Sequence, residues 1–220
     1  MTNTKIIIIC ALIFSISLNA QIKSTIFING SAFNTHPKLQ YVNINDIPVV
    51  SMPIFNIDSL LNEDIFLDEM GVGRPFRFGH NIETDISMAQ GSWSHTEQYN
   101  IWSIRIVSNK AYSLNFVLSD VHLSPNAELY FFNPDGYMVS GPVTSKYIYS
   151  DMNGILPTTL IVGSSIVIQI IEPIRDNQLS HIRISQVTHG YKNTFSSVIM
   201  GKQGDNLQLV DCFGFYETSQ

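Results

Sequence analysis

The sequence predicts an all-β protein, an antiparallel β-sandwich with one short amphipathic helix near its N-terminus. From about residue 99 to 188, apolar and polar residues alternate with a period of two. Turn signals recur about every eight to twelve residues, a spacing typical of a sandwich. Each predicted strand has one apolar face, as expected where two antiparallel sheets cover one core.

The strands follow from this alternation. Trp102, Ile104 and Ile106 share one face of the first, and Ser103 and Arg105 share the other. The same rule predicts strands in YSLNFVL (112–118), AELYFF (127–132), SIVIQII (165–171) and HIRIS (181–185). The turns between them are SNKA (108–111), NPDG (133–136), DMNG (151–154) and GSS (163–165).

Two stretches need separate interpretation. NPDG suits a hairpin turn in which Gly136 takes the positive φ of a bulge. The apolar stretch 155–174 could suggest a membrane helix, but Pro157, Gly163 and Gln169 interrupt it, so two strands joined by a turn explain it better.

The predicted helix runs from about residue 58 to 69, and we expect it to pack on the edge of the sandwich. Asn56 or Asp58 could cap its start, and Gly71 is placed to end it. The apolar residues near one helical face are Ile57, Leu60, Leu61, Ile65 and Met70.

The first 20 residues are typical of a Sec signal peptide: Lys5, then an apolar run, then small Ala20 at the expected cleavage point. We therefore expect a secreted or periplasmic protein with no membrane span after cleavage. The rest divides into a polar N-terminal segment (21–52), the β-sandwich (53–192) and a loose tail (193–220). After cleavage, Cys212 is the one remaining cysteine, so no internal disulfide can form.

Composition and motifs argue against several function classes. Removing the leader takes one lysine and no acidic residue, which changes the net charge from −6 to −7, and no basic stretch indicates nucleic-acid binding. The Gly-x-Ser-x-Gly signature of hydrolases is absent. None of the six histidines forms a zinc-type pair, so no metal or other cofactor is expected, although Asp and Asn in NPDG and DMNG leave calcium open.

Four tyrosines around the predicted hairpin are candidates for an interaction surface: Tyr130, Tyr137, Tyr147 and Tyr149. We expect them to be exposed or half-exposed. Aromatic residues on an outward sheet face can bind sugars or a protein. They can also pair across strands and stabilise the sheet itself.

A family resemblance covers residues 53–192. The ordered stretches PIFNIDSLLNED, GRPFRFG, GSW, IWSIRIVS, YSLNFVLSDVHLSPNAELYFFNPDG, VSGP and RISQVTHGYK resemble the N-terminal pro-region of secreted bacterial lysyl endopeptidases. Those enzymes are serine proteases of the trypsin fold. The 28 residues after Lys192 are too few for such a protease domain, so the resemblance supplies no catalytic triad and we expect no peptidase activity.

The resemblance implies an exported pro-domain that assists folding of a trypsin-like protease domain or inhibits it, here in trans. Cleavage after lysine in that family makes Lys192 and Lys202 candidate processing positions. A functional orphan and a gene remnant are both consistent with the sequence. The alternative from another class is an extracellular accessory or adhesion module that binds glycan or protein.

Overall fold

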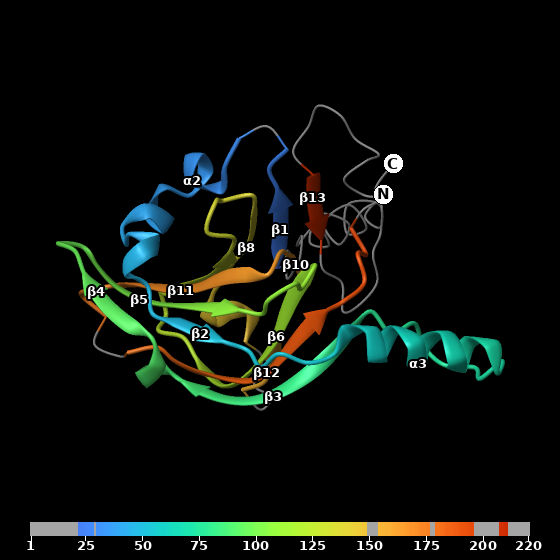
Figure 1. Ribbon diagram of the computed structural model, residues 1–220. Helices are drawn as coiled ribbons and strands as arrows, with labels where there is room; N and C mark the ends of the chain where they lie inside the picture. The colour runs from blue at the N-terminus through green and yellow to red at the C-terminus, as the bar shows by residue number, and fades with distance from the viewer. Residues whose placement is uncertain (1–21, 29, 149–153, 177–178, 196–206, 211–220) are drawn as a thin grey trace, which may run out of the picture.

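The computed structural model describes residues 22–28, 30–148, 154–176, 179–195 and 207–210. In these residues the chain forms two β-sheets packed face to face, which confirms the predicted all-β sandwich (Figure 1). The predicted signal peptide with Ala20 lies outside the described residues, as do Tyr149, Lys202 and Cys212.

The larger sheet has eight strands in the order β13 (Leu207–Val210), β1 (Lys23–Ile26), β8 (Met138–Val143), β7 (Glu128–Phe132), β11 (Ser165–Pro173), β5 (Tyr99–Val107) and β2 (Val49–Ser51), with β4 (Ser92–His95) also beside β5. Neighbouring strands are antiparallel except β2, which runs parallel to β5. The smaller sheet orders β10 (Ile161–Val162), β6 (Ser113–His122), β12 (His181–Gly190) and β3 (Gly79–Ser87), with β9 (Leu156–Pro157) beside β6.

The main core lies between the two sheets. Trp102, Ile104 and Ile106 of β5 point into it, as the alternation predicts, and meet Leu114, Phe116 and Leu118 of β6 in one buried cluster. The indole Nε1 of Trp102 donates to the carbonyl of Met88 at 2.9 Å. Burying apolar surface between the sheets provides the main driving force for the fold.

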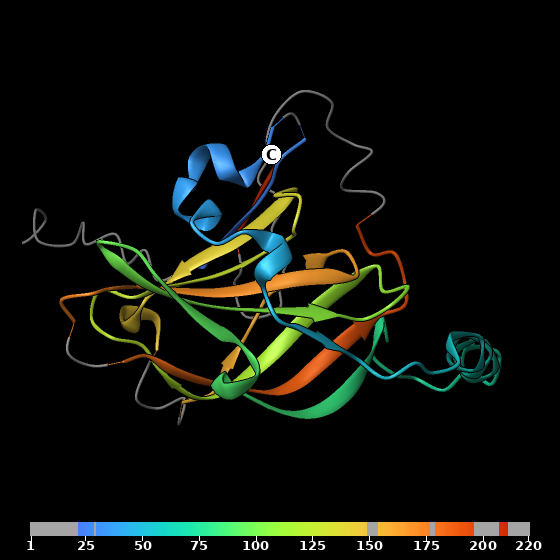
Figure 2. The ribbon, with the colours of Figure 1, turned by 60° about the vertical axis from the view of Figure 1, so that its left-hand side comes forward.

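The outer face of the larger sheet is also buried, contrary to the expectation of one apolar face for each strand. A segment with α2 (Ala32–Thr35), η1 (Pro37–Gln40) and η2 (Ile44–Asp46) crosses this face (Figure 2). It forms a second apolar cluster of Phe27, Ala32, Leu39, Val42, Ile47, Ile101, Tyr130, Phe132, Val139, Val167 and Ile171. The central strands β5, β7 and β11 are therefore apolar on both faces.

The N-terminal segment and the tail both contribute to the larger sheet. Strands β1 and β2 belong to residues 21–52, so the segment shares a sheet with the strands that follow it. Residues 207–210, expected in a loose tail, form β13, whose backbone pairs with β1. This pairing corrects the expected tail at those four positions.

The predicted turns connect strands in two ways. NPDG joins β7 and β8 as a hairpin in which Gly136 has φ +73°. Asn133 holds this turn, because its Oδ1 accepts from the Met138 amide at 2.9 Å and its Nδ2 donates to the Val162 carbonyl. By contrast, the turn at Gly163 leads from β10 in one sheet to β11 in the other, so 155–174 holds strands but no hairpin.

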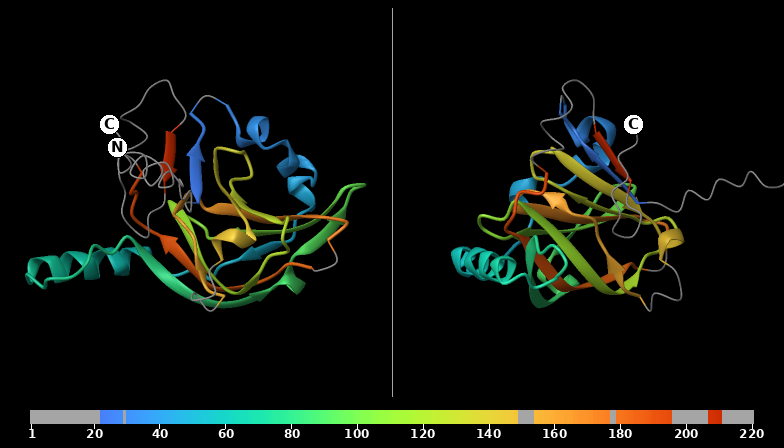
Figure 3. Two further views of the ribbon diagram at one scale, coloured as in Figure 1. Left: turned by 180° about the vertical axis from the view of Figure 1, so that it is seen from behind. Right: turned by 90° about the vertical axis from the view of Figure 1, so that its right-hand side faces the viewer.

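Helix α3 (Ile57–Glu69) forms where the sequence predicts it but does not pack along the sandwich edge. The side chain of Asn56 accepts from the Ser59 amide at 3.2 Å, and Gly71 with φ +65° follows its end. Figures 1 and 3 show α3 projecting from one end of the sandwich, with no sheet beside most of its length. Its residues are mostly exposed, and the buried one is Asp64.

Candidate functional site

Asp64 is the centre of an ionic cluster at the attachment of α3 to the sandwich. Its side chain is one of the few buried carboxylates in the described part of the chain, with the residue 3% exposed. Oδ1 accepts from Arg77 Nε at 2.8 Å and lies 3.2 Å from Arg74 Nη1. Oδ2 accepts from the Tyr191 hydroxyl at 2.8 Å and lies 2.6 Å from Lys192 Nζ.

The two arginines also bind other parts of the helix. Arg74 Nη2 donates to Asp68 Oδ1 at 2.9 Å and to the Asp64 carbonyl at 3.1 Å. Arg77 Nη2 donates to Glu63 Oε2 at 2.8 Å and to the Leu60 carbonyl at 3.3 Å. The segment that follows α3 thus folds back along it and binds it through charge-assisted hydrogen bonds, which are the stronger class.

The electrostatics follow from this geometry. Burial alone would raise the pKa of Asp64, but hydrogen bonds from Lys192, Tyr191 and Arg77 outweigh it and lower the pKa to about 2. Burial, with the hydrogen bond to Asp64, raises the pKa of the Tyr191 phenol. The hydrogen bond to Glu63 and the contact with Asp64 raise the pKa of Arg77. At neutral pH Asp64 is therefore ionised, Tyr191 is neutral and Arg77 is charged.

Three separate stretches of the sequence meet in this cluster. Asp64 ends PIFNIDSLLNED, Arg74 and Arg77 come from GRPFRFG, and Tyr191 with Lys192 ends RISQVTHGYK. These segments are up to 128 residues apart in sequence, and the Tyr191 and Lys192 amides both donate to the Phe78 carbonyl, at 3.0 and 3.1 Å. The fold brings them to one end of the molecule, where α3 begins.

The exposed side of α3 and the segment after it carry apolar side chains, which we call the α3 surface. Phe66 and Met70 lie four residues apart, on the same side of the helix. The α3 surface consists of Ile65 (55% exposed), Phe66 (59%), Met70 (65%), Val72 (48%) and Phe76 (72%). Exposed apolar side chains that gather on one element are a feature of interaction sites in soluble proteins.

The charge of α3 complements this apolar character. Residues 57–69 contain five carboxylates and no lysine or arginine. Glu63, Asp64 and Asp68 are paired with the arginines, whereas Asp58 and Glu69 form no ion pair with other described residues. A partner with apolar and basic side chains would match this surface.

A serine–histidine pair lies beside the base of α3. Ser108 Oγ is 2.7 Å from His189 Nδ1. Both residues are 1% exposed, and within the described residues no carboxylate contacts the other ring nitrogen, Nε2. In a catalytic serine–histidine pair a third group orients the base, and no such group contacts His189 Nε2 in the part of the chain that the structure describes. The geometry of this pair is that of an interior hydrogen bond.

The structure corrects the expected exposure of Tyr130. Tyr130 is buried at 5% exposure beneath the N-terminal segment, where its ring lies 5.5 Å from that of His36 and its hydroxyl donates to Glu128 at 3.3 Å. Tyr137 and Tyr147 are half-buried against the main core. Tyr130 therefore belongs to the second apolar cluster, whereas Tyr137 and Tyr147 pack against the main core.

Of the two candidate processing positions, Lys192 lies in the described part of the chain. Its ammonium binds Asp64 and lies 5.0 Å from the Phe76 ring centroid, and its side chain is 23% exposed. A protease that cuts after lysine must take this side chain into its specificity pocket. Lys192 would have to leave the ionic cluster first.

The described residues contain no group of three or more histidine, cysteine, aspartate or glutamate side chains arranged to hold a metal ion. None of the helices in the same residues has the length and apolarity needed to cross a bilayer.

Sequence reasoning missed Asp64, Arg74, Arg77 and the Ser108–His189 pair. A signal for the first three was present, because two arginines follow an acidic helix that has no cation of its own. For Ser108 and His189, 81 residues apart, no local signal exists, because only the packing of the two sheets brings them together. Neither the models of known protein families nor the solved structures give a match to this chain.

Proposed function

We propose that this chain is an exported pro-domain-like module that binds a trypsin-like protease domain of the lysyl endopeptidase type. It assists the folding of that domain or inhibits it, and has no catalysis of its own. The observation that carries the proposal is that PIFNIDSLLNED, GRPFRFG and RISQVTHGYK meet at Asp64. Asp64 lies where α3 and the segment after it, which we together call the arm, attach to the sandwich. The resemblance supplies the identity of the partner.

The α3 surface supports a binding role. Apolar side chains that are exposed to water on a helix are unfavourably hydrated. A partner that covers them stabilises the complex by roughly 25 cal/mol for each Å² of apolar surface removed from water. The ionic cluster holds the base of the arm in one orientation, which lowers the entropy lost on binding. A stable complex would need about 1,200 Å² or more of total buried surface, so the end of the sandwich beside α3 would also have to contribute.

The interactions of Lys192 disfavour cleavage after it, which leaves Lys202 as the processing position in this proposal. The Lys192 ammonium lies 2.6 Å from Asp64 Oδ2 and its amide donates to the Phe78 carbonyl, so backbone and side chain are both held. Lys202 lies outside the described residues. We therefore assign processing to Lys202 within this proposal.

The accessory or adhesion module is less well supported. It depended on a tyrosine surface, and Tyr130 is buried while Tyr137 and Tyr147 pack against the main core. Five of the exposed large apolar residues lie on α3 and the segment after it, and this group favours a protein partner over a glycan.

The experiment is inhibition of a purified lysyl endopeptidase by refolded residues 21–220, scored with a lysyl reporter substrate. We expect saturable inhibition that Phe66→Ser weakens at least tenfold. Ile174→Ser is the matched control. Ile174 is 50% exposed, close to the 59% of Phe66, but it follows the last residue of β11 and is not part of the α3 surface. A second arm measures how much active protease is recovered when the protease domain refolds with the module.

The proposal fails if the folded module gives neither inhibition at high micromolar concentration nor a gain in refolding. It also fails if Phe66→Ser and Ile174→Ser weaken the effect equally, because the effect would then not depend on α3.

A further inference from the structure

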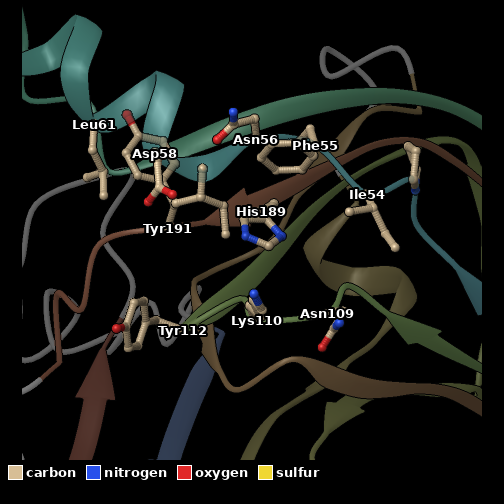
Figure 4. Close-up of a pocket in the computed structure, with 12 residues that line it drawn as sticks. Ile54, Phe55, Asn56, Asp58, Leu61, Asn109, Lys110, Tyr112, His189 and Tyr191 are labelled. Carbon is tan, nitrogen blue, oxygen red and sulfur yellow. The ribbon is translucent and has the colours of Figure 1, made fainter.

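A pocket opens beside the base of α3, with a volume of about 580 Å³. Residues 53–58 and Leu61 form one wall, the loop 109–112 between β5 and β6 forms another, and His189 and Tyr191 complete it. Figure 4 shows Ile54 and Phe55 on one side of the His189 ring and Lys110 with Asn109 on the other. The pocket thus combines an apolar side with a polar side.

His189 gives the pocket a buried hydrogen-bonding atom without a partner. The residue is 1% exposed, and its Nε2 has no hydrogen-bond partner among the described residues. Burial and the neighbouring His80 lower its pKa, which keeps the imidazole neutral. Most buried polar side-chain atoms in proteins are paired, so an unpaired nitrogen in a pocket wall indicates a position for a ligand atom.

The hydrogen-bond network assigns the proton of this imidazole. Ser108 Oγ lies 2.7 Å from Nδ1 and has no other acceptor among the described residues, so its hydroxyl donates to Nδ1. A neutral ring that accepts at Nδ1 carries its proton on Nε2. His189, which lines the pocket, therefore carries a buried N–H donor without a partner among the described residues, and this donor calls for an oxygen acceptor on a ligand.

Lys110 adds a positive charge to the same pocket. It lies in the turn after β5 with φ +66°, a conformation uncommon for lysine, and its ammonium forms no ion pair with other described residues. The carboxylate in the lining belongs to Asp58, which Figure 4 places on the side of Leu61 and Tyr191, away from Lys110 and Asn109. An anionic group would therefore bind on the side of Lys110.

The apolar side favours a ligand with a hydrocarbon group next to its anionic end. The Phe55 ring packs edge-on against His189 with centroids 4.7 Å apart, and Ile57 and Leu61 also line the pocket. Ile54 is 89% exposed beside them. A side chain of the size of leucine could cover Ile54 while its carboxylate meets Lys110 and His189.

We propose that this pocket binds the carboxyl-terminal end of a peptide chain whose last residue is apolar. The carboxylate accepts from His189 Nε2–H and pairs with Lys110, and the last side chain lies against Ile54 and Phe55. The polar groups of Asn56, Asn109 and Tyr112 in the lining suit a peptide better than a fatty acid, which carries no amides. This inference does not rest on a protease as partner of α3.

The test follows the ¹⁵N signals of His189 by NMR in histidine-labelled protein. Acetyl-Gly-Leu is the probe, acetyl-Gly-leucinamide is its neutral counterpart, and hexanoate is an apolar carboxylate without a peptide group. We expect saturable shifts with acetyl-Gly-Leu, with a Kd on the order of 1 mM as for small fragments, and at least fivefold weaker binding of the other two.

Two lysine variants make the test specific. Lys110→Gln should weaken binding of acetyl-Gly-Leu at least fivefold. Lys146→Gln, at an exposed lysine that does not line the pocket, should leave binding unchanged. An unchanged thermal midpoint shows that each variant is folded.

Three results would overturn the inference: no saturable shift of His189, equal binding of the amide and the acid, or equal affinity in Lys110→Gln and the unaltered protein. Binding of hexanoate as tight as that of acetyl-Gly-Leu would overturn the assignment to a peptide end.

Discussion

At the scale of residues, Asp64 decides how the arm is attached. One carboxylate, 3% exposed, accepts from or lies against four side chains that come from two other segments. A buried charge costs free energy unless it is paired, and here the pairing itself forms the attachment. The position is therefore sensitive to loss of charge.

We predict that Asp64→Asn lowers the free energy of unfolding by about 2–3 kcal/mol, because it leaves Arg77, Arg74 and Lys192 without their shared counter-ion. Urea denaturation measures this. Asp68→Asn is the control: Asp68 is 69% exposed and pairs with Arg74, so the expected loss is below about 1 kcal/mol. Equal losses in the two variants would contradict a central role for Asp64.

The pH dependence of the same interaction has a defined sign. Interactions with Lys192, Tyr191 and Arg77 prevail over burial and lower the pKa of Asp64 from 3.8 to about 2. Its contribution is therefore complete above pH 3.8 and is lost as the pH falls through 2. The stability difference between the unaltered protein and Asp64→Asn should be constant above about pH 5 and shrink toward zero near pH 2. If the stability difference disappeared already between pH 7 and 5, the titration of a group other than Asp64 would be responsible for it.

Lys192 should be a poor site for proteolysis in the folded protein. Its ammonium binds Asp64 and its backbone amide is hydrogen-bonded, so a lysine-specific protease should cut after it more slowly than after exposed Lys146. Asp64→Asn should accelerate cleavage after Lys192 at least fivefold and leave cleavage after Lys146 unchanged. Mass spectrometry of a time course distinguishes the two sites.

At the scale of elements, local sequence predicts the helix and the hairpin but not their surroundings. Asn56 and Gly71 cap α3 as expected, and NPDG forms the turn between β7 and β8. The prediction that α3 packs on the sandwich edge was wrong, because the buried side chain of α3 is Asp64 and its apolar residues are not buried. Tyr130 was predicted to be exposed or half-exposed because alternation shows two faces of a strand but does not show that a third layer covers one of them.

The segment that covers the outer face of the larger sheet allows a further prediction. Leu39 is fully buried in the second cluster, at 0% exposure. Leu39→Ala should cost about 2–4 kcal/mol of unfolding free energy, the usual range for a cavity in a core. Tyr41→Ala, at a tyrosine that is 49% exposed in the same segment, should cost less than about 1 kcal/mol. A negligible effect of Leu39→Ala would show that residues 22–47 are not part of the cooperative fold.

At the scale of the whole molecule, the sandwich brings distant segments to one end. PIFNIDSLLNED, GRPFRFG, IWSIRIVS and RISQVTHGYK are separate stretches of sequence, yet they supply Asp64, its arginine partners, Ser108 and His189 beside a common arm. Period-two alternation predicts strands but not which sheet each joins, and β5 and β6 illustrate this because they follow one another in the chain yet lie in different sheets. The candidate site therefore could not be assembled from sequence alone.

We propose that α3 and the segment after it bind a trypsin-like protease domain. The most direct measurement is hydrogen–deuterium exchange of the module, alone and mixed with a lysyl endopeptidase whose active-site serine is replaced by alanine. We predict a complex in which peptides covering residues 54–77 exchange more slowly, while those covering residues 22–40 are unchanged. Absence of a complex, or a complex that protects other regions and leaves 54–77 unchanged, would contradict the claim.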